Sequence, residues 1–273
     1  MTPSNARSAG LPPSALSAGW SPSGWLTLLA TCLRRARQGE APVVALTNIP
    51  VSTAHRSVRV ATPSAMLDGS LAIGARPHGL VVLVDASARA SYAPGNRMVA
   101  EALRAAGFAT LSVSLLAPGE QFDDCMASPL RFDVSTCATR TLGVLQWIST
   151  HPSLSQLPIG VFASGAGAAA ALTACASGAR GVKGVVCRGG RPELAGTRLG
   201  QVRTPTLFLV GENDAAMLAI SRSAASTIGH GSRVATVART RNLLADEHAI
   251  EPVARGAVEW FTNALDGRGV PPS

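Results

Sequence analysis

The segment 157–172 contains a buried apolar run, a turn of Gly, Ala and Ser residues, and an Ala-rich helix. Such a strand–turn–helix can present a nucleophile. It needs small residues two places before and after its apex, because the strand and helix backbones approach closely. With Gly165 at the apex, these places hold Ala163 and Gly167. With Ser164 at the apex, the first place would hold a phenylalanine that collides with the helix start. The spacing therefore predicts Gly165 at the nucleophile position, where the nucleophile is lost, and Ser164 one place early.

Charged residues that follow other predicted strands could form a binding site near this turn. Arg188 and Arg191 flank a Gly-Gly pair, and Asp85 follows a continuous apolar run. Guanidinium groups bind carboxylates and phosphates through paired hydrogen bonds. These residues therefore predict a site for a small anionic ligand. Ion pairs within the loop are the alternative role of the two arginines, since protein carboxylates fit the same fork.

A displaced catalytic pair is a second hypothesis for this region. The candidate nucleophiles are Ser164, Cys187 and Cys125. The candidate bases are His248 and His230. Nothing in the sequence marks Cys187 as a thiolate. A cysteine at a strand end is ordinarily a small buried hydrophobe.

Nucleotide binding is a third hypothesis. Gly165 and Gly167 belong to a match to G-x-G-x-x-A between a strand and a helix, whose N–H groups could cradle a phosphate. The match stands in Ala/Gly-rich sequence and does not open the domain, which weakens it. No cofactor is therefore assigned. No metal site is predicted either, because none of the five cysteines forms a C-x-x-C pair.

Alternating strands and helices must position these residues. The apolar patterns predict strands at 57–61, 67–73, 79–84, 109–115, 159–163, 182–187, 206–210 and 233–237. They predict helices at 96–106, 133–149, 166–177, 215–228 and 250–265. The expected fold is α/β, with a mostly parallel, twisted sheet of about eight strands, an antiparallel first pair, and helices on both faces.

The domain organisation follows from composition. Residues 1–50 are expected to form a flexible arm with a short amphipathic helix near 24–37. That helix could dock on its own domain, on a protein partner or on a membrane surface. Residues 51–267 are expected to form one domain, and 268–273 a tail.

Composition excludes several classes of function. The net charge is +8, but the basic residues are scattered and Lys183 is the only lysine, so nucleic-acid binding is not predicted. The arginine bias suggests a bacterial-like, GC-rich genome. No apolar run approaches the ~20 residues of a transmembrane helix. Positive charges follow the apolar run 25–33, whereas in a secretory signal they precede the apolar run. With an odd number of widely spaced cysteines, this predicts a cytoplasmic protein with reduced thiols.

The chain resembles the dienelactone-hydrolase-like branch of the α/β-hydrolases, some of which are fused to phosphoribosyltransferases. The resemblance covers roughly residues 56–266. It is carried by segments 97–111, 158–172, 188–195 and 205–214. It implies the α/β-hydrolase fold and a carboxylic ester hydrolase. Such an enzyme needs a Ser or Cys nucleophile, an acid, a histidine base, and two N–H groups facing the oxyanion.

The resemblance also shows where the catalytic pattern breaks. It places the retained acid at Asp214, which could equally cap the helix that follows. It places the base at Asn242, where the base is lost, because an amide takes up no proton near neutral pH. It places Asp85 at the oxyanion loop, where a carboxylate would repel the developing charge. With Gly165, three elements fail together. This favours a pseudoenzyme that binds a small molecule or serves as a scaffold; the alternative is an esterase with a rearranged site, Ser164 or Cys187 with His248.

Overall fold

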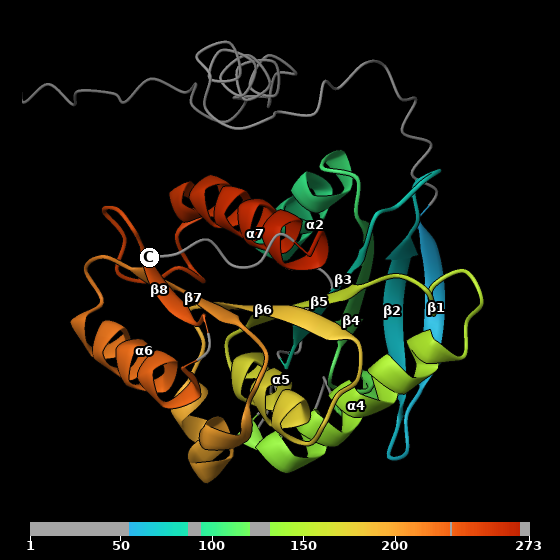
Figure 1. The fold of residues 1–273 in the computed structure, drawn as a ribbon, viewed down its shortest axis with the longest axis horizontal. Helices are drawn as coiled ribbons and strands as arrows, with labels where there is room; N and C mark the ends of the chain where they lie inside the picture. The colour runs from blue at the N-terminus through green and yellow to red at the C-terminus, as the bar shows by residue number, and fades with distance from the viewer. Residues whose placement is uncertain (1–54, 87–93, 121–131, 230, 268–273) are drawn as a thin grey trace, which may run out of the picture. The chain divides into compact units, whose positions relative to one another are not determined.

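A computed structural model of the chain describes residues 55–86, 94–120, 132–229 and 231–267. Their framework is an eight-stranded sheet in the order β1-β2-β4-β3-β5-β6-β7-β8 (Figure 1). The strands are β1 Arg56–Ala61, β2 Met66–Ala72, β3 Leu80–Asp85, β4 Ala109–Ser114, β5 Ile159–Ser164, β6 Val182–Arg188, β7 Thr206–Gly211 and β8 Arg233–Val237. β2 is antiparallel to β1 and β4, and the other pairs are parallel. The predicted fold class is confirmed.

Helices cover both faces of the sheet (Figure 1). One face carries α2 Pro94–Ala105 and α7 Ile250–Leu265, and the other carries α4 Val134–Ser149, α5 Gly167–Ala176 and α6 Ala215–Ile228. Each face has its own apolar core, one with Phe162, Leu103 and Phe261, the other with Val161, Ile148 and Leu172. Burial of apolar area in these two layers is the main driving force for folding.

Polar residues fix where two of the helices begin. Asp133 caps α4 by accepting a hydrogen bond from Thr136 N at 3.1 Å. Asp214 caps α6 by accepting one from Met217 N at 3.0 Å. Both caps satisfy an N–H group that has no partner within the helix. The predicted cap at Asp133 is confirmed.

The strands and helices expected between residues 57 and 265 are all present; α6, β8 and α7 have the predicted bounds, and the bounds of the others differ by one or two residues. No helix was predicted for η3, the 3₁₀ segment Pro192–Gln201. Gly196 interrupts this segment with φ +54°, which explains why it carries no helical apolar period. A second 3₁₀ turn, η4 Glu247–Ala249, precedes α7.

The strand order creates a crevice at one edge of the sheet. β3 lies between β4 and β5. The connection from β3 leads to β4 on one side, and the next connection, from β4, leads to β5 on the other side of β3. Ligands of open α/β sheets bind at such a switch point, outside the carboxyl ends of the strands. Asp85, Ser164 and Arg188 end β3, β5 and β6 and therefore meet there.

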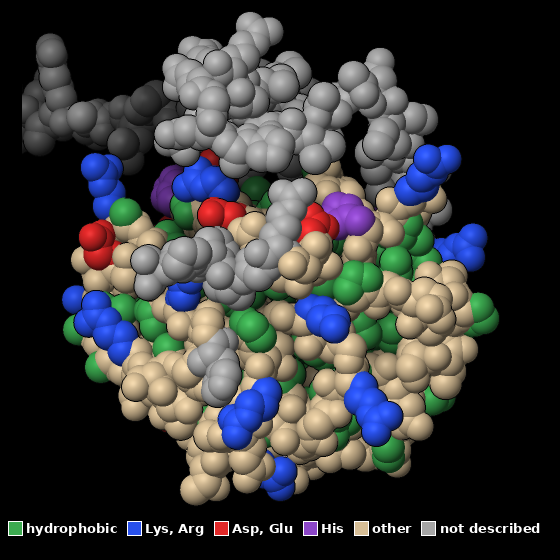
Figure 2. Space-filling model, viewed as in Figure 1, with side chains coloured by type: hydrophobic (Ala, Val, Ile, Leu, Met, Phe, Trp, Pro, Cys, Tyr) green, Lys and Arg blue, Asp and Glu red, His purple; other side chains and the backbone are tan. Residues whose placement is uncertain are grey.

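Some predictions fall on residues outside the described ranges. These are the arm 1–50, its helix near 24–37, the tail 268–273, Cys125 and His230. Within the described helices, none has the length and apolarity needed to cross a bilayer. The basic side chains on the face shown in Figure 2 are spread singly over the surface.

Candidate functional site

The turn between β5 and α5 has the backbone of a nucleophile-bearing elbow. Gly165, at its apex, has φ +56°, the left-handed conformation that costs most residues free energy. A Cβ built on Gly165 would meet only Leu244 Cδ1, at an ordinary 3.7 Å. On Gly167 it would lie 3.1 Å from the Val84 carbonyl oxygen. The apex thus has room for a side chain and carries none, whereas Gly167 lies close against a neighbouring strand.

Ser164, one residue before the apex, has its hydroxyl engaged by a neighbouring carboxylate. Its side chain is 1% exposed, and its Oγ donates a hydrogen bond to Asp85 Oδ2 at 2.7 Å. Asn96 Nδ2, at the start of α2, donates to the same carboxylate oxygen at 3.0 Å. The carboxylate therefore orients the hydroxyl toward β3. No described histidine forms a hydrogen bond with this hydroxyl.

Arg188 lies at the same strand ends and is 3% exposed. Its Nε and Nη2 donate to the Leu243 carbonyl oxygen at 3.2 and 2.6 Å, and its Nη1 donates to Asn96 Oδ1 at 3.4 Å. Burial lowers the pKa of Arg188, and the nearby Asp85 carboxylate opposes that change. Arg188 still carries its charge, because a guanidinium does not lose its proton in proteins. It ties the loop after β8 to the centre of the sheet.

Asn96 connects the two charged groups. Its amide nitrogen donates to Asp85, and its amide oxygen accepts from Arg188. Gly95 makes room for this arrangement, because a Cβ there would lie 2.6 Å from Arg188 Nη1. Asn96 was predicted only as the start of a helix and not as a site residue. The adjacent glycine was the one local signal of a close approach.

These groups line a cavity of about 770 Å³. The structure brings all six residues of the predicted crevice to its wall: Asp85, Gly165, Arg188, Arg191, Asp214 and Asn242. Phe132 and Leu244 also line it, and both are unusually exposed for large apolar side chains, at 45% and 48%. Neither residue was among the predicted site residues. The cavity thus combines polar strand ends with exposed apolar side chains.

The positions of the acid and the base are engaged by local backbone. Asp214 Oδ1 accepts from Met217 N, and Asn242 Oδ1 accepts from Leu244 N at 3.0 Å. His248 is exposed, its N–H bonds to Asp246 Oδ1, and it does not line the cavity. Nor does any other histidine of the described ranges. The geometry therefore offers this cavity no imidazole from the described part of the chain.

The other candidate residues have partners or are buried. Arg191 is half-exposed, and its Nε bonds to Glu193 Oε1 at 2.7 Å, as in the ion-pair alternative. Cys187 is 1% exposed, and burial raises the pKa of its thiol. Among described residues, no group of three or more His, Cys, Asp or Glu side chains could hold a metal ion.

Comparison with known proteins places this geometry among relatives. No family model matches the chain. Two Mycobacterium tuberculosis proteins, from strains CDC 1551 and H37Rv, are named "Putative phosphoribosyl transferase". Each is 37% identical to this chain over 212 residues, which are 78% of this chain and 47% of the relative. The chain thus spans about half the length of these curated relatives.

Solved structures show the same fold along nearly their whole length. Est1E from Butyrivibrio proteoclasticus and the dienelactone hydrolase-like promiscuous phosphotriesterase P91 from metagenomic libraries are 14% and 15% identical, with TM-scores of 0.63 and 0.64. They cover 77% and 78% of this chain, and this chain covers 99% of each. The dienelactone hydrolase from Anabaena variabilis is 35% identical, with a TM-score of 0.75 over 78% of this chain and 99% of its own. With its elbow turn, switch-point cavity and sheet order, this chain belongs to the dienelactone hydrolase family of α/β-hydrolase-fold proteins.

Proposed function

We propose that this chain is a non-hydrolytic member of its family that binds a small molecule in the cavity at the strand ends. One observation carries the proposal. The residue in the elbow conformation is Gly165, which has no nucleophile, and the neighbouring hydroxyl of Ser164 is buried against Asp85. Ser164 borders the cavity, but it is 1% exposed and its Oγ is bonded to Asp85, so an ester carbon has little access to this oxygen.

The surrounding charges support the same conclusion. Ester hydrolysis builds negative charge on the former carbonyl oxygen, which must be met by positioned donors. The strand end beside the elbow instead carries the Asp85 carboxylate, which opposes that charge. Asn242 can take up no proton at neutral pH, so it cannot serve as the base. Nucleophile, base and oxyanion stabilisation are thus all missing from the positions that the family uses.

The cavity wall indicates what kind of ligand would fit. Phe132 and Leu244 offer exposed apolar surface, while Asp85 and Arg188 end β3 and β6, on either side of β5. Arg191 is half-exposed on the wall and forms an ion pair with Glu193. It can bind a ligand carboxylate or phosphate in place of the Glu193 carboxylate. We therefore propose a small ligand with an apolar body and an anionic group.

Hydrolysis of short-chain p-nitrophenyl esters tests the proposal. We expect the wild-type protein to show no rate above background at neutral pH. Ser164→Ala and His248→Ala should give the same result, and so should Ser135→Ala, a matched serine on the exposed start of α4. Fluorophosphonate should not label Ser164. A clear wild-type rate that either of the first two substitutions abolishes, while Ser135→Ala retains it, would refute the proposal and establish the displaced pair instead.

A further inference from the structure

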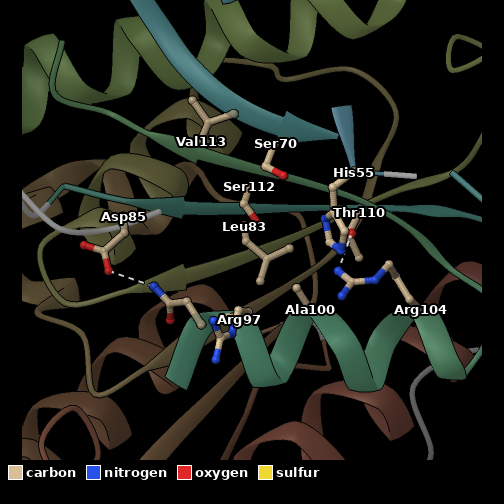
Figure 3. Close-up of a pocket in the computed structure, with 11 residues that line it drawn as sticks. His55, Ser70, Leu83, Asp85, Arg97, Ala100, Arg104, Thr110, Ser112 and Val113 are labelled. Carbon is tan, nitrogen blue, oxygen red and sulfur yellow. Dashed lines mark hydrogen bonds between the residues drawn. The ribbon is translucent and has the colours of Figure 1, made fainter. Parts of the chain in front are cut away.

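A second, smaller pocket lies beside the large cavity, between α2 and the strands β2, β4 and β3 (Figure 3). Its volume is about 110 Å³, enough for a small inorganic ion. Asp85 and Asn96 line both pockets, so their hydrogen bond separates the two. The proposed function makes no use of this smaller pocket.

Hydroxyl groups and a leucine form the sheet side of the pocket. Ser70 of β2 is the direct partner of Ser112 in β4, and Ser112 is the partner of Leu83 in β3. Thr110 lies two residues before Ser112, so its side chain points to the same face. Within the described ranges, the hydroxyls of Ser70 and Ser112 have no hydrogen-bond partner. Two donors on this wall are therefore open to a ligand.

Positive charge comes from the opposite side. Arg97, Ala100 and Arg104 are three and four residues apart on α2, and all three line the pocket. The small side chain of Ala100 lies between the two arginines (Figure 3). His55, just before β1, lies near Arg104 and Thr110 in the same view. Asp85 is the acidic residue on the wall, and it lies at the far end, where Asn96 binds it.

Arg104 is less well satisfied than the buried Arg140 and Arg188. Arg140 binds Glu120 through two contacts of 2.6 and 2.7 Å, and Arg188 binds a carbonyl oxygen. Among described residues, the hydrogen-bond partner of Arg104 is a neutral hydroxyl, Thr110 Oγ1, at 3.3 Å. Burial lowers the pKa of Arg104, and Glu101 opposes this through its charge without a hydrogen bond. A guanidinium that is partly desolvated and has no anionic hydrogen-bond partner among the described residues favours binding of an anion.

We propose that this pocket binds a phosphate-type oxyanion, held by Arg104 and Arg97 and by the hydroxyls of Ser70, Thr110 and Ser112. A tetrahedral oxyanion suits the site, because it can accept from α2 and from the strands at the same time. Hydrogen bonds to charged donors are the strong ones, so Arg104 contributes most. The proposal does not depend on the ligand of the larger cavity.

Titration calorimetry of the full chain with inorganic phosphate tests the site. A titration with chloride at the same ionic strength is the control for nonspecific binding of anions, because the protein is basic. We expect saturable binding that Arg104→Gln weakens at least about tenfold. The matched control is Arg198→Gln, an exposed arginine bonded to Ser177, which should bind phosphate like the wild type. If Arg104→Gln fails to fold, the double variant Ser70→Ala and Ser112→Ala decides, and we expect a similar loss.

Three results would overturn the proposal. The first is no saturable binding of phosphate by the wild type. The second is an unexpected response of the variants. Equal binding by the wild type and Arg104→Gln would assign phosphate to the general surface, and loss of binding in Arg191→Gln instead would assign it to the larger cavity. The third is acetate binding as tightly as phosphate at equal ionic strength, since a planar monoanion would not need both walls.

Discussion

Asp85 ends β3 and the buried Arg188 ends β6, on either side of β5, and the buried Asn96 connects them. Buried charge is costly unless it is paired and hydrogen-bonded. Asn96 meets this need with one side chain, since it donates to the carboxylate and accepts from the guanidinium. Ser164 adds a second donor to Asp85. A hydroxyl that could serve chemistry is thereby committed to satisfying a carboxylate.

Cysteine reactivity separates the binding hypothesis from a displaced thiol nucleophile. Burial raises the pKa of the Cys175 thiol to about 11, and it raises that of Cys187 as well. Only the thiolate reacts, so both should resist alkylation in the native protein. We expect iodoacetamide at pH 8 to leave the peptides of Cys175 and Cys187 unlabelled, as read by mass spectrometry. The same peptides should be fully labelled in urea, which is the control. Rapid native labelling of Cys187 would contradict the burial argument and revive the thiol as a nucleophile.

At the residue scale, the sequence was sufficient wherever a site residue follows directly from a strand end. Asp85, Gly165 and Arg188 could be brought together because parallel strands end at one edge of the sheet. Asn96 could not, because its place depends on how α2 packs over β3 and β4. That packing is a property of tertiary structure and leaves no periodic signal in the chain.

A pair of glycines lets α7 lie close to the sheet. Gly160 of β5 and Gly184 of β6 are direct partners in the sheet. A Cβ on Gly160 would lie 2.5 Å from Phe261 Cδ1, and a Cβ on Gly184 would lie 2.9 Å from Ala264 Cβ. Phe261 is fully buried, so its ring has little room to shift. The absence of two side chains therefore sets the depth at which this helix packs.

Replacing Gly160 tests this account of the helix position. We expect Gly160→Ala to lower the free energy of unfolding by about 1–3 kcal/mol, because overpacking displaces buried side chains. Urea denaturation followed by circular dichroism measures the change. Gly74→Ala is the matched control, since a Cβ there meets nothing within 4 Å, and its effect should stay within about 0.5 kcal/mol. Equal effects of the two substitutions would show that α7 is not held against Gly160.

At the element scale, prediction from sequence succeeded where the apolar pattern was continuous. β3 and β7 are buried along nearly their whole length, and α6, β8 and α7 have the bounds that were predicted. The pattern failed for η3, where Pro192 and Gly196 interrupt any regular period. A short 3₁₀ segment is defined by its packing against α5 and α6 more than by its own residues.

For the whole molecule, one buried arginine joins segments that are distant in sequence. Arg140 of α4 donates to the Leu115 carbonyl oxygen after β4, to Ser64 in the β1–β2 turn, and to Glu120. The arginine side chain is 3% exposed and the glutamate 31%, so solvent screens the pair only in part. This contact links the antiparallel hairpin at one end of the sheet to the helix layer that covers its middle.

The pair makes stability depend on pH in a defined direction. The hydrogen bonds from Arg140 hold the pKa of Glu120 below its ordinary value. A carboxyl whose pKa is lower in the folded state stabilises the fold above its unfolded pKa of about 4.3. That contribution is lost as pH falls through the lower, folded pKa. Stability measured in urea should therefore drop between about pH 5 and pH 2, and part of the drop should belong to Glu120.

Glu120→Gln isolates that part. At pH 7 we expect the variant to be less stable by about 1 kcal/mol, because a neutral amide binds the guanidinium less strongly. Below pH 5 its stability should fall less steeply than that of the wild type, since it has no carboxyl to protonate at this site. Glu251→Gln is the matched control, because its exposed pair with Arg255 at 3.9 Å contributes little. Parallel curves for Glu120→Gln and the wild type would mean that the buried arginine is satisfied by its carbonyl and hydroxyl partners, and that the first hairpin is held without the ion pair.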